Sequence, residues 1–347
     1  MSLVIALDAM GGDNAPAIVV EGAAAALRGQ PDLRFLLFGD EAAIRPLLAR
    51  TPELTAKVEL THTPHAVAAD ARPSLAVRQG RNSSMRLAID AVKAGAAAAA
   101  VSAGNTGALM GMATLVLRTL PGIDRPAIAA ILPTQRNPVV VLDLGANVEC
   151  SEENLVQFAV MGEVYSRVML AVPEPRVALL NIGTEELKGG DVVRRAAARL
   201  KEASLNIAFA GFVEGHDVTN GAADVVVTDG FTGNVALKIA EGTAAMFTRA
   251  LRDAFASTWR GRLGYLIARP GLQALRDQFD PRRYNGAMFL GLNGVVVKSH
   301  GGTDALGFSS AVRVAADLVR QRTTERIIEE MERLAAARPT GVKAAVS

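Results

Sequence analysis

The sequence predicts an α/β protein with an open, mostly parallel sheet, helices on both faces of that sheet, and two lobes. Half of the 347 residues are hydrophobic and only 4% are aromatic, so the core must consist mainly of Ala, Val, Leu and Ile. That composition is typical of parallel strands buried under helices. Short β-branched runs also alternate with longer helical patterns along the chain. The length fits a single catalytic unit over residues 1–337, and we expect a disordered tail over 338–347.

The first third of the chain gives the first elements of this pattern. We expect strands at Leu3–Leu7, Arg34–Phe38 and Val58–Leu60, and helices at Pro16–Arg28 and from Ser84 to Lys93. Pro16 suits a first helical turn, and Asn82-Ser83-Ser84 is a capping sequence. Residues 62–81 show no clear periodicity and are predicted to be a long loop, a kind of segment that is often functional.

Five later strands end in loops that combine Gly with Asn or Thr and lead into helices. They are predicted at Ala97–Val101, Val139–Leu142, Val177–Leu180, Val225–Val227 and Val295–Lys298. The carboxyl ends of parallel strands share one edge of a sheet, where ligands bind. We therefore expect the five loops to converge on one site.

The stretch Val225–Lys238 is the most informative of these connections. A buried strand enters a Gly-bearing loop, and Thr232-Gly233-Asn234 opens a long helix. Free N–H groups and the positive end of a helix dipole favour an anion such as phosphate. Gly230 and Gly233 would let the backbone approach that ligand closely. The same pattern also suits an ordinary strand-to-helix connection.

Several common kinds of site are excluded. The sequence has no Gly-x-Gly-x-x-Gly dinucleotide motif, no P-loop and no Gly-x-Ser-x-Gly nucleophile elbow. Cys150 is the only cysteine, which excludes an internal disulfide and is better explained by packing than as a nucleophile. The histidines lack zincin spacing, so no metal site is expected. With no signal peptide and no membrane-spanning apolar run recognised, we expect a cytoplasmic protein without a nucleic-acid partner.

The remaining polar residues of the loops are neutral donors and lysines. They are Asn105, Thr106, Asn147, Thr184, Thr232, Asn234, Lys188, Lys238 and Lys298. This set suits a reaction in which an anion such as inorganic phosphate is itself the nucleophile, because it needs orientation rather than an activating base. Lys188, next to Gly189-Gly190, has the best functional case. Lys238 could equally be a solvated helix residue, and Lys298 a charge at a strand end.

Residues 249–283 form a basic segment with eight Arg and three Asp, a net charge of +5. We expect a protruding helical hairpin at about 246–283, with its apex at Gly261–Gly264 and a second helix restarting after Pro270-Gly271. The stripe from Phe247 to Phe255 is predicted to pack on the core or on a dimer partner. The predicted apex carries an apolar tip ringed by positive charge, which suits an anionic membrane surface or an acidic carrier protein. Its residues are Arg260, Arg262, Leu263, Leu266, Ile267 and Arg269.

Taken together, the motifs resemble a known family. LDAMGGDNAP, RNSSM, VSAGNTGALM, RPAIAAILP, VLDLGANVEC, NIGTEELKGG, DVVVTDGFTGNVALK and VVKSHGG, in order from Asp8 to about Ala311, resemble the phosphate acyltransferases of bacterial phospholipid synthesis, the PlsX type. The resemblance implies transfer of a fatty acyl group from acyl carrier protein to inorganic phosphate, giving an acyl phosphate for a membrane glycerol-phosphate acyltransferase. It also implies a fold similar to phosphate acetyltransferases and isocitrate/isopropylmalate dehydrogenases, a homodimer, no metal or organic cofactor, and peripheral association with the inner face of the cell membrane.

The resemblance further implies roles for individual residues. Lys188 in TEELKGG and Asn234 in DGFTGN would be the catalytic pair. The residues expected to line the substrate and phosphate cleft are Asp8, Gly11, Gly12, Gly104, Asn105, Thr106, Gly183, Thr184, Gly230, Thr232, Gly233 and His300.

Two other functions remain open on the sequence. A short-chain phosphate acetyltransferase would use coenzyme A as its donor, and a non-catalytic regulator would bind acyl groups without turnover. Supplying the purified protein with each donor separates the acetyltransferase from a fatty acyl transferase. Phosphate-dependent thiol release from acyl carrier protein separates the regulator.

Overall fold

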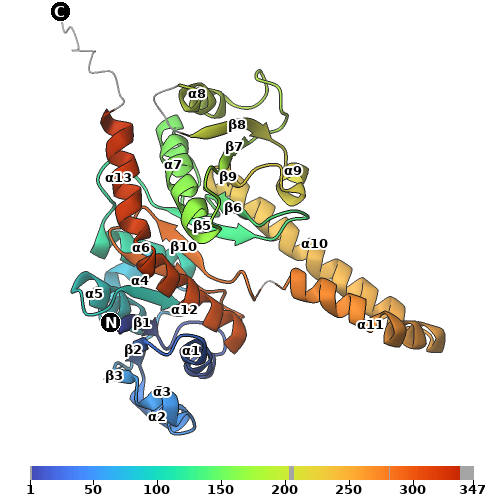
Figure 1. Ribbon diagram of the computed structural model, residues 1–347. Helices are drawn as coiled ribbons and strands as arrows, with labels where there is room; N and C mark the ends of the chain where they lie inside the picture. The colour runs from blue at the N-terminus through green and yellow to red at the C-terminus, as the bar shows by residue number, and fades with distance from the viewer. Residues whose placement is uncertain (1, 203–206, 281, 337–347) are drawn as a thin grey trace, which may run out of the picture.

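The computed structural model describes residues 2–202, 207–280 and 282–336 (Figure 1). The tail predicted at 338–347 lies outside these residues. In the described part of the chain, one 11-stranded sheet has the order β3-β2-β1-β4-β11-β10-β5-β6-β9-β7-β8. The strands are β1 (Leu3–Asp8), β2 (Leu33–Gly39), β3 (Val58–His62), β4 (Ala99–Ser102), β5 (Ala127–Leu132), β6 (Val139–Leu142), β7 (Arg176–Leu180), β8 (Ala208–Val213), β9 (Val225–Val227), β10 (Ala287–Leu290) and β11 (Val295–Lys298).

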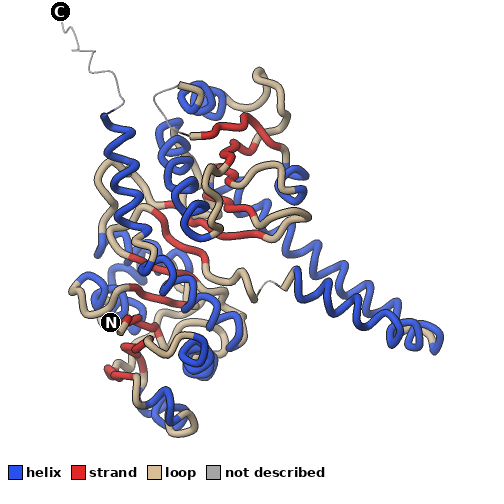
Figure 2. Tube along the Cα trace, in the orientation of Figure 1, coloured by secondary structure: helices blue, strands red, loops and turns tan. Residues whose placement is uncertain are grey.

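Helices flank the strands in both halves of the molecule (Figure 2). Their bounds are α1 (Ala17–Gly29), α2 (Glu41–Leu48), α3 (Pro52–Thr55), α4 (Pro73–Gln79), α5 (Ser84–Lys93), α6 (Thr106–Leu117), α7 (Glu152–Met169), α8 (Asp191–Leu200), α9 (Gly215–Asn220), α10 (Gly230–Ala256), α11 (Trp259–Gln278), α12 (Ala305–Arg320) and α13 (Thr323–Ala336). The described helices include none that is both long and apolar enough to cross a membrane.

The predicted fold class is confirmed, because the sheet is open, mostly parallel and covered on both faces. Side chains alternate between two buried clusters, as the pleat of a strand requires. In β1, Ile5 and Leu7 join one cluster with Val19 of α1, whereas Ala6 joins the other with Met85 of α5. The near-continuous Val, Ile and Ala runs of the strands follow from burial on both faces.

The expectation that all five strand exits share one edge is wrong. Strands β3, β2, β1, β4 and β11 are parallel to one another, and β6, β9, β7 and β8 are parallel to one another. Between these groups, β10 pairs antiparallel with both β11 and β5, and β5 pairs antiparallel with β6. The two groups therefore run in opposite directions. We call the first group with its helices the first lobe, and the second group with its helices the second lobe.

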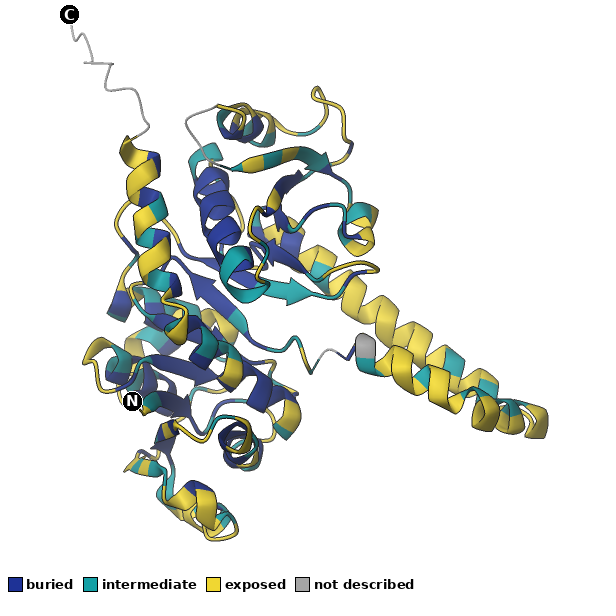
Figure 3. Cartoon of the chain, viewed as in Figure 1, coloured by how far each residue is buried: buried dark blue, intermediate teal, exposed yellow. Residues whose placement is uncertain are grey.

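Helices α10 and α11 form a hairpin that projects from the body of the molecule (Figures 1 and 3). Only Gly230 and Gly233 of α10 are buried, and Phe247 is 67% exposed, so its stripe does not pack on the core. The hairpin turns at Ser257-Thr258, where the Thr258 hydroxyl accepts the N–H of Gly261 and caps α11. Both the predicted apex at Gly261–Gly264 and the predicted restart after Pro270 lie inside α11, because this cap starts the helix earlier.

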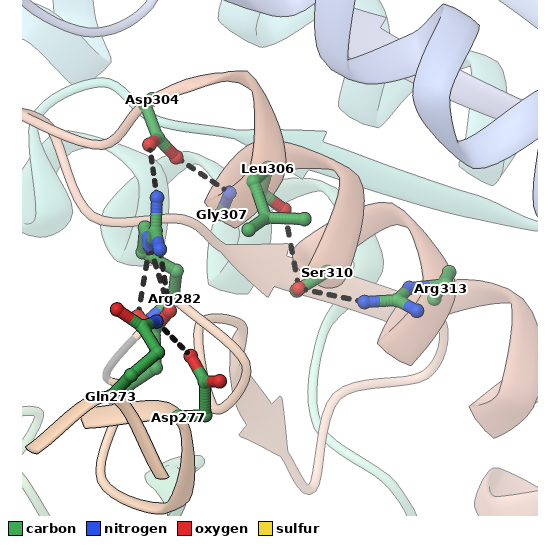
Figure 4. A network of polar contacts seen from close by, with 9 residues as sticks. Gln273, Asp277, Arg282, Asp304, Leu306, Gly307, Ser310 and Arg313 are labelled. Atoms are coloured by element: carbon green, nitrogen blue, oxygen red, sulfur yellow. Dashed lines mark hydrogen bonds and ion pairs between the residues drawn. The ribbon is translucent and has the colours of Figure 1, made fainter. Parts of the chain in front are cut away.

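After α11, the side chain of Arg282 links the base of the hairpin to the start of α12 through ion pairs (Figure 4). Its guanidinium binds the buried carboxylate of Asp280, with Nη2–Oδ2 at 2.6 Å, and reaches Asp304 with Nη1–Oδ2 at 3.0 Å. Asp304 also accepts the N–H of Gly307 and so caps α12. These bonds from Arg282 lower the pKa of Asp280, and the Gly307 N–H followed by Arg282 lowers the pKa of Asp304. One charge cluster thus joins the hairpin base to the first lobe.

The loop predicted at 62–81 contains a short helix, α4. Pro73 lies in its first turn, and burial of Ala76 against α6 stabilises it without strong periodicity. The other predicted strands and helices lie within a few residues of the observed elements.

Candidate active site

The exits of the first lobe are organised around the buried carboxylate of Asp8. Its Oδ1 accepts the Ser84 hydroxyl at 2.6 Å, and its Oδ2 accepts the Ser102 hydroxyl at 2.6 Å. Burial raises the pKa of Asp8, while these hydrogen bonds oppose the rise. A Cβ at Gly11 would clash with the Asp8 carboxylate and with the Gly104 N–H. Asp8, Gly11 and Gly104 are therefore brought together as predicted, with Asp8 as the residue that holds the loops in place.

The exit of β11 closes the same side of the first lobe. The N–H of Asp13 donates to the carbonyl of Gly301 at 3.0 Å, and a Cβ at Gly12 would crowd that carbonyl. Exposed His300 accepts the Gly302 N–H on Nδ1 at 3.2 Å. Gly12 and His300 thus lie on neighbouring loops of one rim.

Asn105 is occupied by structural bonds. Its Oδ1 accepts the N–H of Ala108 and caps α6, while its Nδ2 donates to the carbonyls of Ala69 at 2.8 Å and Ala71 at 3.1 Å. Within the described residues, the backbone N–H groups of Thr106 and Gly107 have no acceptor. The start of α6 therefore offers backbone donors to an anion, whereas the Asn105 amide holds the 62–81 segment.

Lys298 lies at the end of β11, opposite Ser102 of β4, the strand whose exit loop leads into α6. Its ammonium donates to the carbonyl of Ala103 at 3.4 Å and to that of Ser299. No carboxylate of the described chain lies within ion-pair distance of it. Burial lowers the pKa of Lys298 to about 8, although the carboxylates of Asp13 and Asp8 attract the charge. A buried cation without a paired anion is costly unless a ligand supplies the negative charge.

In the second lobe, Asp143 follows β6 and is fully buried. Its carboxylate accepts N–H groups from Ile128 at 3.0 Å, Ala146 at 2.9 Å and Asn147 at 2.7 Å, and it accepts the Asn147 amide as well. Burial raises the pKa of Asp143, while these bonds lower it. The Asn147 carbonyl then accepts the N–H of Gly230 at 2.7 Å. Asp143 therefore seats the first turn of α10.

The side chain of Asn234, just after that turn, has no hydrogen-bond partner in the described chain. The hydroxyl and N–H of Thr232 both bind Asp229, which caps α10. Gly233 packs against the backbone of Asp143, where a Cβ would not fit. The exposed side chain of Asn234 lies beside Gly145 and forms no hydrogen bond within the described chain. Its amide is available to a substrate.

Lys188 lies in the loop that joins β7 to α8. Its N–H donates to the carbonyl of Glu185, and its own carbonyl accepts the Asn181 amide at 3.1 Å. Gly189 has a φ of +85° and packs against Asn181, so a side chain there would be both strained and blocked. The stem of Lys188 lies over Gly183, and Thr184 is exposed beside it. Lys188 and Asn234 follow parallel neighbouring strands, but no hydrogen bond joins their side chains in the described structure.

One face of α10, which belongs to the second lobe, lies within electrostatic range of the first lobe. Positions 231, 234, 235 and 238 have the spacing of a single helical face. Lys238 on this face is close enough for its charge to lower the pKa of Lys298, although burial is the larger cause. Helix α10 of the second lobe thus brings Lys238 within electrostatic range of Lys298 of the first lobe, although the exits of the two lobes do not share a sheet edge.

Cys150 and Asp143 also bear on the chemistry of the site. Burial raises the pKa of the Cys150 thiol to about 11, so it is protonated at neutral pH and a poor nucleophile. Sequence reasoning gave Asp143 no role, yet it follows a buried strand and precedes a Gly-bearing loop, as Asp8 does. No group of three metal-ligating side chains occurs in the described ranges.

The chain matches known proteins over most of its length. A family described as fatty acid synthesis protein matches residues 3–326. Over 333 residues the chain is 60% identical to a phosphate acyltransferase of Rhodospirillum rubrum, covering 96% of this chain and 95% of the relative. It is 56% identical to one of Granulibacter bethesdensis, covering 96% and 90%.

Solved structures show the same fold at low identity. A phosphotransacetylase from Streptococcus pyogenes has a TM-score of 0.62 at 18% identity, covering 92% of this chain and 94% of that one. A 4-hydroxythreonine-4-phosphate dehydrogenase from Klebsiella pneumoniae has a TM-score of 0.53 at 17% identity, covering 92% and 98%.

Proposed function

The chain belongs to the fatty acid synthesis protein family, whose curated relatives are phosphate acyltransferases, and we propose that it transfers a fatty acyl group from acyl carrier protein to inorganic phosphate. The observation that carries the phosphate half of this function is Lys298. Its largely buried ammonium lacks an ion-pair partner in the described chain. It lies at the end of β11, beside β4, the strand that leads into α6, where the N–H groups of Thr106 and Gly107 are unpaired. A phosphate dianion matches both the charge and the donors.

The reaction needs no covalent enzyme intermediate. A phosphate oxygen attacks the thioester carbonyl carbon, the C–S bond breaks, and the proton of hydrogen phosphate ends on the departing thiol. In this proposal the first lobe holds phosphate through Lys298 and the start of α6. The free amide of Asn234 donates to the carbonyl oxygen as negative charge develops, and Lys188 binds phosphate or steadies the thiolate.

The hairpin supports a second part of the proposal, which concerns partners. Leu263, Leu266 and Ile267 are 52%, 63% and 77% exposed in the first turns of α11, and they lie among exposed Arg260, Arg262 and Arg269. Apolar side chains ringed by arginine suit an anionic bilayer surface, where each Arg adds about 1 kcal/mol of attraction. We propose peripheral association with the inner face of the cell membrane, which would deliver the product to a membrane glycerol-phosphate acyltransferase.

The exposed apolar stripe of α10 supports a homodimer. Ile239, Met246 and Phe247 are all more than 60% exposed, and such a row is typical of a helix that packs on another subunit. Analytical ultracentrifugation of the full chain tests this; a monomer at micromolar concentration would contradict it.

The decisive experiment supplies purified protein with palmitoyl-acyl carrier protein and inorganic phosphate and measures acyl phosphate. We expect formation that requires phosphate, with no acyl-protein adduct detected by mass spectrometry. Turnover with acetyl-coenzyme A alone would favour the short-chain alternative, and binding without turnover would favour the regulator.

Leu263→Glu combined with Ile267→Glu tests the membrane surface separately. This variant should lose binding to vesicles containing phosphatidylglycerol but keep turnover of a water-soluble thioester. Loss of carrier-dependent turnover with unchanged vesicle binding would instead identify the segment as the carrier-protein dock.

A further inference from the structure

A pocket of about 530 Å³ opens beside the first turn of α10. It lies between the loop after β6 and the first turns of α7, α8 and α10. Its lining residues are Val148, Glu149, Cys150, Leu155, Val192, Val193, Asp229, Phe231 and Thr232. Its volume falls within the range of small-molecule sites in proteins.

The lining of this pocket is suited to an apolar ligand. Leu155 is buried at its floor, and Val192 and Val193 of α8 form one wall. The Cys150 thiol contributes no charge, because its pKa is raised to about 11. Asp229 and Thr232 at the rim already bind each other at 2.8 Å, so they demand no polar partner from a ligand. A long hydrocarbon chain would bury its surface against these apolar side chains. The carboxylate of Glu149, which also lines the pocket, is exposed to solvent.

The pocket is also in line with the candidate catalytic groups. Phe231 lines it, and Asn234 and Lys238 follow on the same face of α10. At about 1.5 Å per residue, Asn234 lies about 4.5 Å and Lys238 about 10 Å beyond Phe231 along the helix axis. Along this face the pocket wall at Phe231 comes first, then the amide of Asn234, then the ammonium of Lys238, whose charge influences Lys298. An acyl thioester attacked by phosphate presents its alkyl chain, carbonyl and incoming anion in that same order.

We infer that this pocket receives the alkyl chain of the acyl donor and that its walls set the preferred acyl length. The inference rests on the proposed function, since it takes the donor to be an acyl thioester. It assigns the wall residues Val192 and Val193 to substrate selection, a role that the motifs of the sequence did not indicate.

Val193→Trp tests the inference by filling the pocket. Each methylene withdrawn from an apolar site costs about 0.8 kcal/mol, or about fourfold in binding, so a ring that displaces three methylenes should lower kcat/KM for palmitoyl-acyl carrier protein roughly 50-fold. The butyryl donor should lose less than about threefold, because its chain does not reach the wall. Ala198→Trp, on the exposed side of the same helix, is the matched control and should leave the ratio unchanged.

Equal loss for both donors, or no change in their ratio in a variant that folds, would overturn the inference. An absence of acyl phosphate with every donor in the unaltered enzyme would overturn the proposed function instead. A second measurement does not depend on turnover or on the variant. Cys150 is the only cysteine, so its alkylation by N-ethylmaleimide reports on the pocket alone. Palmitoyl-acyl carrier protein without phosphate should slow this alkylation at least fivefold relative to butyryl-acyl carrier protein; equal rates would contradict occupancy by the chain.

Discussion

The two lobes each end a central strand with a buried aspartate, but they use it differently. Asp8 in the first lobe accepts two short hydrogen bonds from side-chain hydroxyls, those of Ser84 and Ser102, and a longer one from the Met10 N–H at 3.3 Å. Asp143 in the second lobe binds backbone N–H groups from its own loop and from Ile128 of β5, together with the amide of Asn147. Hydroxyls can rotate to other acceptors, whereas backbone N–H groups cannot.

This difference suggests separate roles for the two lobes. We propose that the first lobe works through charge, with Lys298 and the start of α6 binding the anion while Asp8 aligns their loops. In the second lobe, backbone N–H groups surround the Asp143 carboxylate and fix the position of the first turn of α10. The side chain of Asn234 on that helix forms no hydrogen bond in the described chain. We therefore expect first-lobe variants to change phosphate binding and second-lobe variants to change the chemical step or the fold.

Asn234→Ala should give the largest effect. Loss of an oxyanion donor elsewhere costs about 10²–10³ in kcat, and we expect a similar loss here with the KM for phosphate changed less than about threefold. Steady-state kinetics with palmitoyl-acyl carrier protein, together with a thermal melt that shows an intact fold, provide the measurement. A variant that keeps near-normal kcat would remove Asn234 from the mechanism.

Asp143→Ala should lower the free energy of unfolding by about 3 kcal/mol or more, because several buried N–H groups lose their acceptor. Asp8→Ala should cost about 1–2 kcal/mol, since the two serine hydroxyls can find other partners. Urea denaturation of both variants makes the comparison. Equal losses would show that the two carboxylates have equivalent structural roles, against the distinction drawn above.

Lys298→Met should raise the KM for phosphate by about 10- to 100-fold, the range for a hydrogen bond to a charged group, with a smaller change in kcat. Lys93→Met is the control, because Lys93 is an exposed cation in the last turn of α5, before β4 begins. Titration with inorganic phosphate at fixed acyl donor gives both constants. An unchanged KM would leave the buried ammonium without a ligand role.

The pH dependence of phosphate binding should show the smallest effect. Below a pKa of about 8 Lys298 carries its charge, and above that value the unliganded enzyme loses it. The KM for phosphate should therefore rise by up to about tenfold between pH 7 and 9, and bound phosphate should raise the pKa of Lys298. Lys298→Met should abolish this rise; a rise that persists in the variant would point to another titrating group.

Much of this architecture is predictable from local sequence. The strands at Leu3–Leu7, Val139–Leu142 and Val295–Lys298 were identified because β-branched runs buried on two faces leave a strong pattern. The cap at Ser83 was identified because the capping chemistry is local. The antiparallel strands β10 and β5, which reverse the sheet between the lobes, were not found, because strand direction depends on pairing between distant segments.

The site divides in the same way. Gly11, Gly104 and Asp8 were predicted together, and the structure joins them. The sequence leaves Lys298 open between a functional cation and a strand-end charge, because the two differ in burial and in distance from carboxylates, neither of which a motif reveals. The hairpin apex was misplaced because Gly261, Gly264 and Pro270 favour breaks locally, while the Thr258 cap and the antiparallel partner helix override them.

Helix α10 begins at the cage of Asp143 and continues without a break to the far end of the hairpin. Its 27 residues make a stiff rod of about 40 Å, and a tilt of about 5° at the first turn displaces the far end by about 3.5 Å. Conversely, binding of the hairpin end to a surface restricts the tilt of α10, and with it the orientation of Asn234 and Lys238 near the start of that helix. A surface that binds the end of the hairpin would thereby fix the angle at which α10 holds the Asn234 amide.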